Sequence, residues 1–500
     1  MARQAATTID DLPDQILGHI MELAGLDHGR IVRLVSKRWQ RVVLSEPAFW
    51  RTFRLTTGRQ GQPISQQQAW LLGKLRQLSL VTDWVKEFVV PDWGGLEAAA
   101  AAGGLHLSNF LQACQLAMLN RGVVVEMDLA SAGVVPEAVL RQLPDFPMLE
   151  TLKLRSSTLL PLATAGVVGR LMQLRCFRCH AGVLLSAELA DSVHTLSRLT
   201  RLELTAAVVA PTTLQQLTCL AQLSHFGLRQ TAQSSARIPA ELPLELPLPT
   251  AFPSLASFDL YAARGIQMGD AQLRGCNFAV GQHPSIPGRQ IGVLCIGGIS
   301  TMSSLQGLLA ALLPAGKPFS YLELEHCQLA PAALRDCRLL AELPALHFNS
   351  CSSGGSVAAA LDPLLQQAGK LETLSLTGSL GALSFPVSLK TKTGLKKLRF
   401  RQNRLEDIPA GVYLKSLELL DIGGENLSHG ILPPALVAAT SLSELVLSSS
   451  SKIKVKRDDI DNVLAEMPSL RRLVVGSATM TAVVAQYIQK AMPHLQVKRS

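Results

Sequence analysis

Aromatic side chains and long apolar runs are both scarce in this 500-residue sequence. Aromatic residues make up 5% of the chain although 48% of it is hydrophobic, so a core must consist mainly of Leu, Ala and Val. An uncharged stretch, residues 292–316, is long enough to cross a bilayer, but it contains Ser, Thr, Gln and several glycines. We therefore expect a buried repeat there and no membrane insertion.

Features of exported proteins are also missing. The opening MARQAATTIDDLP has no apolar segment and carries Asp10 and Asp11, which argues against a secretory signal or a transit peptide. The nine cysteines, an odd number, form no spaced disulfide framework, so we expect free thiols and a cytoplasmic or nuclear location. The net charge of +9 is modest for this length, and we expect no nucleic-acid partner.

Motifs of catalysis and of cofactor binding are not found. The sequence has no H-E-x-x-H and no G-x-S-x-G. Cys176-x-x-Cys179-His180 matches a haem-attachment pattern, but Cys179 occupies a position where the repeats described below have an inward leucine. Pro318 follows Gly316-Lys317 where a phosphate loop needs Ser or Thr. We predict no catalytic residue, no cofactor and no metal site, and hence no enzyme.

The pattern that is abundant is L-x-x-L-x-L. Its steps are 25, 25 and 24 residues between 149 and 223, and 24, 28, 24, 22, 25 and 28 between 319 and 470, within the period of leucine-rich repeats. The clear copies are Leu149-Leu152-Leu154, Leu174-Phe177-Cys179, Leu199-Leu202-Leu204, Leu223-Phe226-Leu228, Leu255-Phe258-Leu260, Phe319-Leu322-Leu324, Leu343-Leu346-Phe348, Leu371-Leu374-Leu376, Leu395-Leu398-Phe400, Leu417-Leu420-Ile422, Leu442-Leu445-Leu447 and Leu470-Leu473-Val475. Weaker copies are Val124-Met127-Leu129, Ile291-Leu294-Ile296 and Leu75-Leu78-Leu80.

Alternation in L-x-L sends the leucines to one face of a short strand and their neighbours to the other. Strands of successive repeats then stack into a parallel sheet, closed by the apolar segments between them. Cys327, Cys351 and Asn403 fall on the N/C position of the motif. The array resembles the leucine-rich-repeat family, which implies a horseshoe with a parallel sheet on its concave side.

Two longer steps interrupt the array. The step from 223 to 255 is 32 residues and includes a Pro-rich run, and the step from 255 to 291 is 36 residues and is rich in Gly. We expect loop insertions near 230–253 and 264–290, because proline blocks regular strand pairing. The Pro-rich run could alternatively be a ligand for a domain of another protein.

A separate helical module is predicted at residues 8–54. Apolar stripes at Ile16-Leu17-Ile20 and Val35-Trp39-Val42, and a cap at Ser45, indicate three short helices. These residues resemble the F-box of F-box leucine-rich-repeat proteins, of the plant and green-algal type. In that family the module binds a Skp adaptor, which bridges to a cullin. The resemblance assigns adaptor binding to Leu12, Pro13, Ile16, Leu17, Ile20, Val35, Ser36, Trp39 and Trp50.

The predicted fold class is α/β: a three-helix F-box followed by a leucine-rich-repeat solenoid. The expected boundaries are 8–54 for the F-box, 55–122 for a linker with a poorly matched first repeat, and 123–500 for the repeats. Capping of the first repeat is the alternative role of the helical module.

Residues that flank the leucines should face the concave surface, where horseshoes usually bind ligands. Many are basic, which suggests an acidic or phosphorylated target segment, because Arg binds carboxylate and phosphate bidentately. A merely solvated face is the alternative. The candidate target-binding residues are Lys153, Arg155, Arg178, Arg201, Arg229, Lys397, Arg399 and Arg401.

Together these features predict the substrate-recognition subunit of a Skp–cullin–F-box ubiquitin ligase. A leucine-rich-repeat scaffold of a cytoskeletal or ciliary assembly is one alternative. A receptor for a small molecule such as an inositol polyphosphate, similar to plant hormone-sensing F-box proteins, is another.

Overall fold

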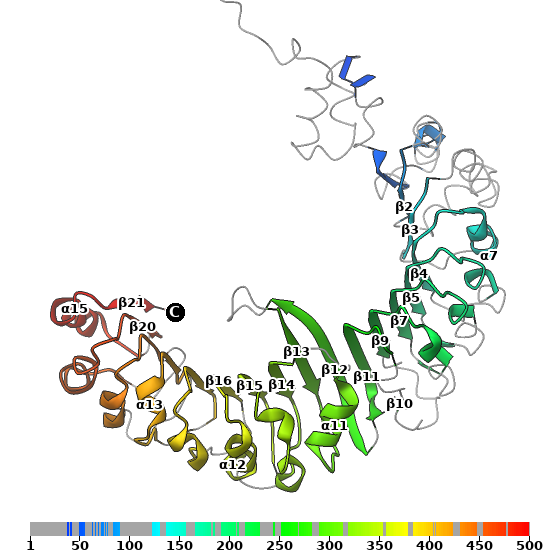
Figure 1. The fold of residues 1–500 in the computed structure, drawn as a ribbon. Coiled ribbons are helices and arrows are strands. Elements are labelled where there is room, and N and C mark those ends of the chain that lie inside the picture. Colours follow the sequence, from blue (N-terminus) through cyan, green and yellow to red (C-terminus); the bar gives the residue numbers. More distant parts are fainter. Residues whose placement is uncertain are drawn as a thin grey trace, which may run out of the picture. The chain divides into compact units, whose positions relative to one another are not determined.

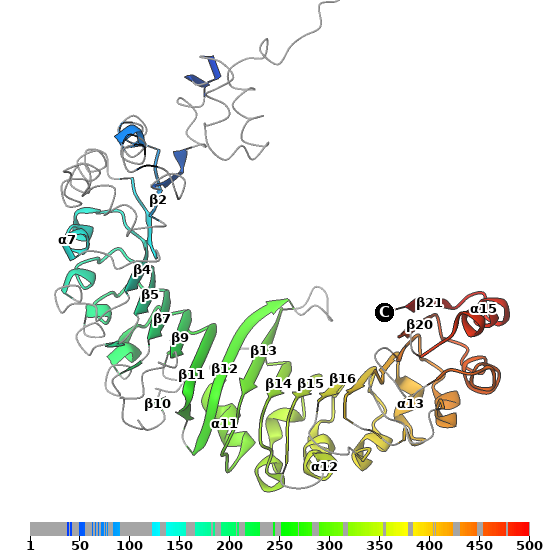
Figure 2. The ribbon, with the colours of Figure 1, turned by 180° about the vertical axis from the view of Figure 1, so that it is seen from behind.

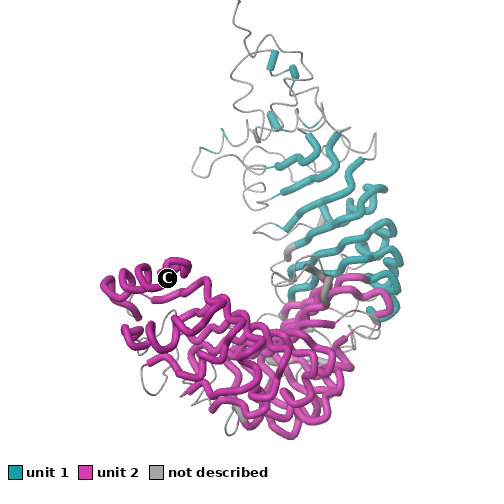
Figure 3. Tube along the Cα trace, turned by 60° about the vertical axis from the view of Figure 1, so that its left-hand side comes forward, with its two compact units in different colours: residues 1–223 teal, residues 224–500 magenta. Residues whose placement is uncertain are grey.

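A computed structural model gives the structure of the chain. The residues it describes are 38–39, 41–42, 50–55, single positions between 63 and 78, 84–90, 123–130, 137–156, 166–181, 184–185, 192–206, 208–209, 216–230, 244–245, 252–268, 270–282, 290–313, 319–353, 357–378, 384–403, 405, 407–423, 431–447, 454–476 and 479–499. They form two compact units, residues 1–223 and 224–500 (Figure 3).

The first unit is built on a parallel sheet. Its strands pair with their neighbours in chain order, every pair being parallel. They are β1 (Thr52–Arg54), β2 (Glu87–Val89), β3 (Glu126–Leu129), β4 (Thr151–Ser156), β5 (Cys176–Ala181) and β7 (Arg201–Ala206). The short strands β6 (Leu184–Leu185) and β8 (Val208–Val209) pair separately.

Helical segments cover one face of this sheet. α7 (Glu137–Leu140) and a 3-10 helix, Leu143–Asp145, connect β3 to β4 behind the sheet (Figures 1 and 2). The inward residues of the strands, such as Leu152, Phe177 and Leu202, are completely buried beneath them. The opposite face carries the residues that alternate with these, and we call it the open face in both units.

Repeats begin earlier than the sequence predicted. Trp50, Phe53 and Leu55 are buried in the first repeat, and the Phe53 ring stacks on that of Phe88 in β2, with centroids 6.2 Å apart. The segment 55–122, predicted as a linker with a poorly matched first repeat, contains β2, and the sheet starts at residue 52. The weak copy at 75–80 was wrong, because Leu78 lies in a helix.

The second unit continues the same architecture. Its strands are β9 (His225–Gln230), β10 (Leu244–Glu245), β11 (Ser257–Met268), β12 (Ala271–Gln282), β13 (Gln290–Gly297), β14 (Tyr321–Glu325), β15 (Ala345–Asn349), β16 (Thr373–Thr377), β17 (Lys397–Arg401), β18 (Leu419–Asp421), β19 (Glu444–Leu447), β20 (Arg472–Val475) and β21 (Gln496–Arg499). From β13 to β21 each pairs in parallel with the next.

β12 departs from this pattern. It lies between β11 and β13 and is antiparallel to both, so the chain returns within the sheet. We expected a loop at 264–290, but residues 264–268 and 271–282 are strand. The reason is a second set of apolar residues: Leu273, Cys276 and Phe278 are buried and lie opposite the inward residues of β11. Of the other expected insertion, 230–253, the structure describes only residues 230, 244–245 and 252–253.

Five successive strands of the second unit end in the same backbone conformation. The residue after each of β13 to β17 has a positive φ: Gly298, His326, Ser350, Gly378 and Gln402. The next residue can then turn a polar atom back under the sheet. Asn403 Nδ2 donates to Leu376 O at 2.8 Å, and the Cys351 thiol donates to Leu324 O at 3.2 Å. At these two N/C positions of the motif, the side chain therefore hydrogen-bonds to the backbone of the preceding repeat.

Return segments of the second unit are mostly short helices. They include α11 (Leu305–Leu312), α12 (Val357–Gln367), α13 (Tyr413–Ser416), α14 (Arg457–Asp459), α15 (Ala482–Ala491) and the 3-10 helices Pro331–Leu334, Val387–Thr391 and Pro434–Ala438. Residues 292–316 contain most of β13 and all of the amphipathic α11. This agrees with the buried repeat expected there. Among the described residues, none of the helices has the length and apolar character needed to cross a bilayer.

Candidate functional site

The helical module contributes few described residues. Residues 38–39 and 41–42 are helical, Trp39 is half-buried and Val42 is buried. The rest of the expected three-helix unit, and with it seven of the adaptor-binding candidates, lies outside the described residues: Leu12, Pro13, Ile16, Leu17, Ile20, Val35 and Ser36.

Trp50 has a structural position that the sequence did not predict. It is only 6% exposed and occupies the first apolar position of the first repeat, as Val85 does in the second. An aromatic or a valine replaces leucine in both repeats, and the steps between them exceed the usual period. The module thus runs directly into the sheet.

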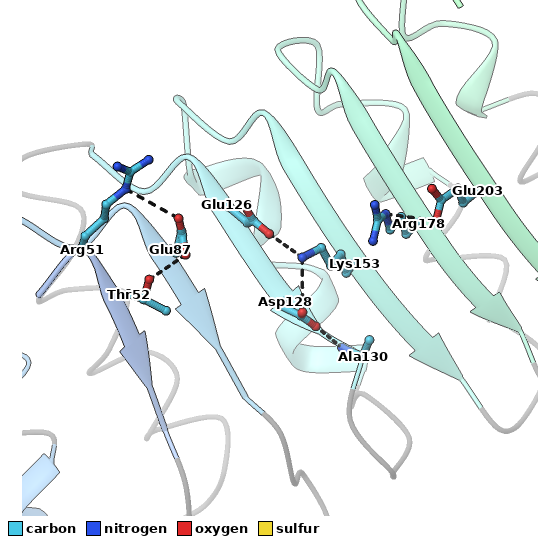
Figure 4. A network of polar contacts seen from close by, with 9 residues as sticks. All are labelled: Arg51, Thr52, Glu87, Glu126, Asp128, Ala130, Lys153, Arg178 and Glu203. Atoms are coloured by element: carbon cyan, nitrogen blue, oxygen red, sulfur yellow. Dashed lines mark hydrogen bonds and ion pairs between the residues drawn. The ribbon is translucent and has the colours of Figure 1, made fainter. Parts of the chain in front are cut away.

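On the open face of the first unit, acidic and basic side chains pair across neighbouring strands (Figure 4). Lys153 Nζ lies 2.5 Å from Glu126 Oε1 and 3.5 Å from Asp128 Oδ2. Burial lowers the pKa of Lys153, but the hydrogen bond and charge of Glu126, with a smaller effect of Asp128, raise it more, so the net shift is upward. The ammonium is therefore held by two carboxylates of β3.

A second pairing lies further along the same face. Arg178 Nε is 3.1 Å from Glu203 Oε2, and Arg201 Nη2 is 2.5 Å from Glu203 Oε1. At the other end of the sheet, Arg51 Nε is 3.7 Å from Glu87 Oε1, and Glu87 accepts a hydrogen bond from Thr52 (Figure 4). The predicted basic stripe is therefore interleaved with carboxylates in this unit.

Two further candidates are paired in the second unit. Arg229 lies 3.6 Å from Asp259 on β11. Arg401 places Nη2 and Nε 2.6 and 2.7 Å from Oδ2 of Asp421, whose side chain is 2% exposed. Gly423 N–H donates to the other oxygen of Asp421 at 3.1 Å. The Arg401 guanidinium thus forms an ion pair with the buried carboxylate of Asp421.

The remaining candidates differ in their surroundings. Arg155 lies in β4, and its side chain is outside the described set. Lys397 and Arg399 are half-buried on β17. Within the described part of the chain, Arg399 has no acidic side chain at ion-pair distance, which sets it apart from the paired arginines.

A cluster that sequence reasoning missed lies on β13, β14 and β15. Val293 and Cys295 pack against Tyr321 and Ala345, which are 7% and 2% exposed although they belong to the open face. The Tyr321 ring lies 4.6 Å from that of His347, measured between centroids. Its signal in the sequence was the occurrence of apolar residues at flanking positions that are polar or charged in other repeats.

Glu323 is the acidic centre of this cluster. Its Oε2 accepts hydrogen bonds from Tyr321 Oη at 3.1 Å and from Cys295 Sγ at 3.6 Å. Burial, followed by the charge and hydrogen bond of Glu323, raises the pKa of Cys295 to about 12. Burial, followed by the charge and hydrogen bond of Glu323, also raises the pKa of Tyr321. The positive charge of Arg399 lowers it by a smaller amount. Both donors therefore keep their protons at neutral pH.

The haem-attachment pattern seen in the sequence does not form a ligand site. Cys179 is buried while His180 is exposed on the other face, so the Cys176–His180 segment does not direct its side chains to one point. No group of three or more His, Cys, Asp or Glu suited to a metal occurs among the described residues. The described cysteines are free thiols. Residues 316–318 lie outside the described set.

Residues 9–56 match the F-box-like family. The match ends two residues after β1, so it includes the first strand of the sheet. A search of curated proteins gives no match.

Three solved structures are similar to this chain at low sequence identity. A leucine-rich-repeat protein of Leptospira interrogans is 15% identical, with 91% of this chain and 97% of that chain covered and a TM-score of 0.44. An internalin of Listeria monocytogenes is 13% identical over 71% and 81% of the two chains, with a TM-score of 0.38. A chain of the Drosophila Toll–Spatzle complex is 14% identical over 73% and 49%, with a TM-score of 0.47.

Because these TM-scores are low, the repeat architecture rests on the strand pairings and buried leucines described above. The chain combines an F-box-like segment with a leucine-rich-repeat sheet.

Proposed function

We propose that this protein is the substrate-recognition subunit of a Skp–cullin–F-box ubiquitin ligase. Residues 9–56 would bind the Skp adaptor, and through it a cullin, while the open face of the repeats binds a target protein. The observation that carries the proposal is the F-box-like match at residues 9–56, joined directly to a repeat sheet. F-box domains in general bind Skp adaptors.

In this proposal the chain itself is not catalytic. It would act in the cytoplasm or nucleus and position the target for a ubiquitin-charged enzyme held by the cullin. The direct junction supports such a role, because Trp50 and Phe53 belong to the module and to the sheet core at once. Membership of the plant and green-algal type remains a prediction.

The predicted acidic or phosphorylated target requires refinement. Lys153, Arg178 and Arg201 already bind carboxylates of the chain itself, so an incoming anion would have to displace them. The basic residues of the first unit are therefore weaker candidates than Arg399.

The adaptor assignment is tested by a pull-down of the full chain with purified Skp adaptor. The parent is expected to bind. A variant with Leu12→Ala, Pro13→Ala and Trp39→Ala, shown to be folded by circular dichroism, is expected not to. Arg399→Gln is the matched control and should bind like the parent.

Binding by neither the parent nor Arg399→Gln would contradict the ligase role and favour the scaffold reading. Equal binding by all three would show that the adaptor contacts other residues.

A further inference from the structure

Several charged side chains on the open face of the second unit are paired with one another. Arg229 pairs with Asp259, Arg401 with Asp421, and Arg472 with Glu444 at 3.4 Å. Such pairs leave little net charge for a partner to recognise. In the middle of the sheet, Glu323 on β14 and Arg399 on β17 have no ion pair among the described residues.

Glu323 and Arg399 lie in the same row across the sheet. The strand register places Cys295, Glu323, His347, Ser375 and Arg399 opposite one another in that order. Neighbouring strands are about 4.8 Å apart, so the two charged residues begin about 14 Å apart at the backbone.

The surroundings of Glu323 leave part of its carboxylate available. Its two described hydrogen-bond donors, the Tyr321 hydroxyl and the Cys295 thiol, both reach Oε2. Both are neutral, and no cationic group lies at ion-pair distance from Glu323 among the described residues. The half-buried position strengthens the attraction of this carboxylate for a cation relative to bulk water.

Apolar residues surround the acidic end of the row. Val293, Tyr321 and Ala345 lie in the adjoining row of the same face, and Tyr321 and Ala345 are already largely buried. A shallow apolar surface beside an unpaired carboxylate suits a Lys or Arg whose aliphatic stem lies on Val293 and Tyr321.

An extended peptide crossing the strands matches this spacing. Four residues of extended chain span about 13 Å, and residues i and i+4 point to the same side. A basic residue at Glu323 and an acidic residue at Arg399 would then both face the sheet.

We propose that the row from Glu323 to Arg399 recognises an extended segment of the target protein that carries a basic and an acidic residue four positions apart. This inference rests on the proposed function, in which the open face binds a target. It names a target segment of mixed charge in place of a purely acidic one.

The test uses random peptides displayed on phage and selected against the full-length chain. Enrichment of Lys or Arg four positions from Asp or Glu is expected. An enriched peptide, measured by fluorescence anisotropy, should lose about tenfold in affinity with Glu323→Gln and likewise with Arg399→Gln. Glu323→Gln keeps an oxygen that can accept the hydrogen bonds of Tyr321 and Cys295.

The exchange of both charges, Glu323→Arg with Arg399→Glu, should recover most of the affinity, because the peptide can bind in the opposite direction. Glu444→Gln and Arg472→Gln, a pair on the same face outside the row, are controls expected to change affinity less than twofold.

Selection of peptides with charge of one sign only, no enrichment at all, or unchanged affinity in Glu323→Gln and Arg399→Gln would overturn the inference. The adaptor pull-down does not involve these residues. A negative peptide result with a positive pull-down therefore rejects this recognition mode alone, and a negative pull-down rejects the ligase role.

Discussion

Individual side chains of this protein are distinguished mainly by what they pair with. Arg401 and Arg229 look alike in the sequence, but Asp421 is buried and Asp259 is 46% exposed. Removing the cation beside a buried carboxylate strongly lowers the free energy of unfolding, whereas an exposed ion pair contributes little to it.

Arg401→Gln is therefore expected to lower the free energy of unfolding by about 2 kcal/mol, since half of the Arg401 side chain is exposed and water can partly replace it. Arg229→Gln should cost about 0.5 kcal/mol or less. Urea titrations of both variants against the parent measure the difference. Equal losses would show that Asp421 does not depend on Arg401.

Thiol reactivity reports on the contact between Glu323 and Cys295. Because burial and Glu323 raise the pKa of Cys295, its reactive thiolate is rare at pH 8. Glu323→Gln removes the negative charge, so the pKa should fall and alkylation by iodoacetamide should become several-fold faster at that pH. Mass spectrometry of digested samples measures the rate at each cysteine.

Cys179 is the internal control for this measurement. Its pKa is raised to about 12 by burial alone, so Glu323→Gln should leave its slow alkylation unchanged, and exposed Cys219 should react fastest of the three. A Cys295 rate that does not respond to Glu323→Gln would contradict the contact.

Whole strands were predicted well wherever leucine and a regular period coincided. The L-x-x-L-x-L copies from 149 to 475 each lead into a strand of the sheet, because alternation fixes which side chains are buried. β1 and β2 were missed because Trp, Phe and Val occupy the leucine positions and the steps are long.

β12 was missed for a different reason. Its glycines suggested a loop, and the apolar Leu273, Cys276 and Phe278 were not recognised as the buried residues of a strand. Only the neighbouring strands reveal that Gly275 is needed, since a Cβ there would lie 2.7 Å from Leu260 O.

Because β12 is buried, its inward side chains should contribute strongly to stability. Phe278→Ala should lower the free energy of unfolding by about 3–5 kcal/mol, because the ring is fully buried against Phe258. Asn277→Ala, its exposed neighbour, should cost less than about 0.5 kcal/mol. Chemical denaturation followed by circular dichroism compares them. Similar small effects would mean that residues 271–282 behave as a loop.

The candidate site could be predicted only in part. The basic residues were identified, but not their partners, because Lys153 and Glu126 are 27 residues apart and meet only through the register of two repeats. The placement of Glu323 and Arg399 in one row was not predictable for the same reason, because it depends on the register of the strands between them.

At the scale of the whole molecule, the F-box-like segment and the first repeats share one core. The family match extends to residue 56, and within it Trp50, Phe53 and Leu55 are buried against the sheet. A boundary drawn at the end of the match would therefore cut through packed structure.

A chain of residues 57–500 should be less stable than one of residues 50–500, because it loses β1 and the Phe53 ring that stacks on Phe88. Loss of that side chain alone corresponds to about 3 kcal/mol, or roughly 6–12 °C in the melting temperature of a unit this size. Thermal unfolding of both chains provides the comparison. Identical melting curves would show that β1 adds nothing to the sheet.

The returning strand β12 also has a consequence for how the chain folds. Two parallel neighbours can pair only after the connection between them, roughly twenty residues long, has closed. In contrast, β11, β12 and β13 form an antiparallel meander whose contacts are close in sequence. Contacts of short sequence separation form sooner, since less chain entropy is lost before they are made. We therefore expect this meander to form early in the folding of the second unit.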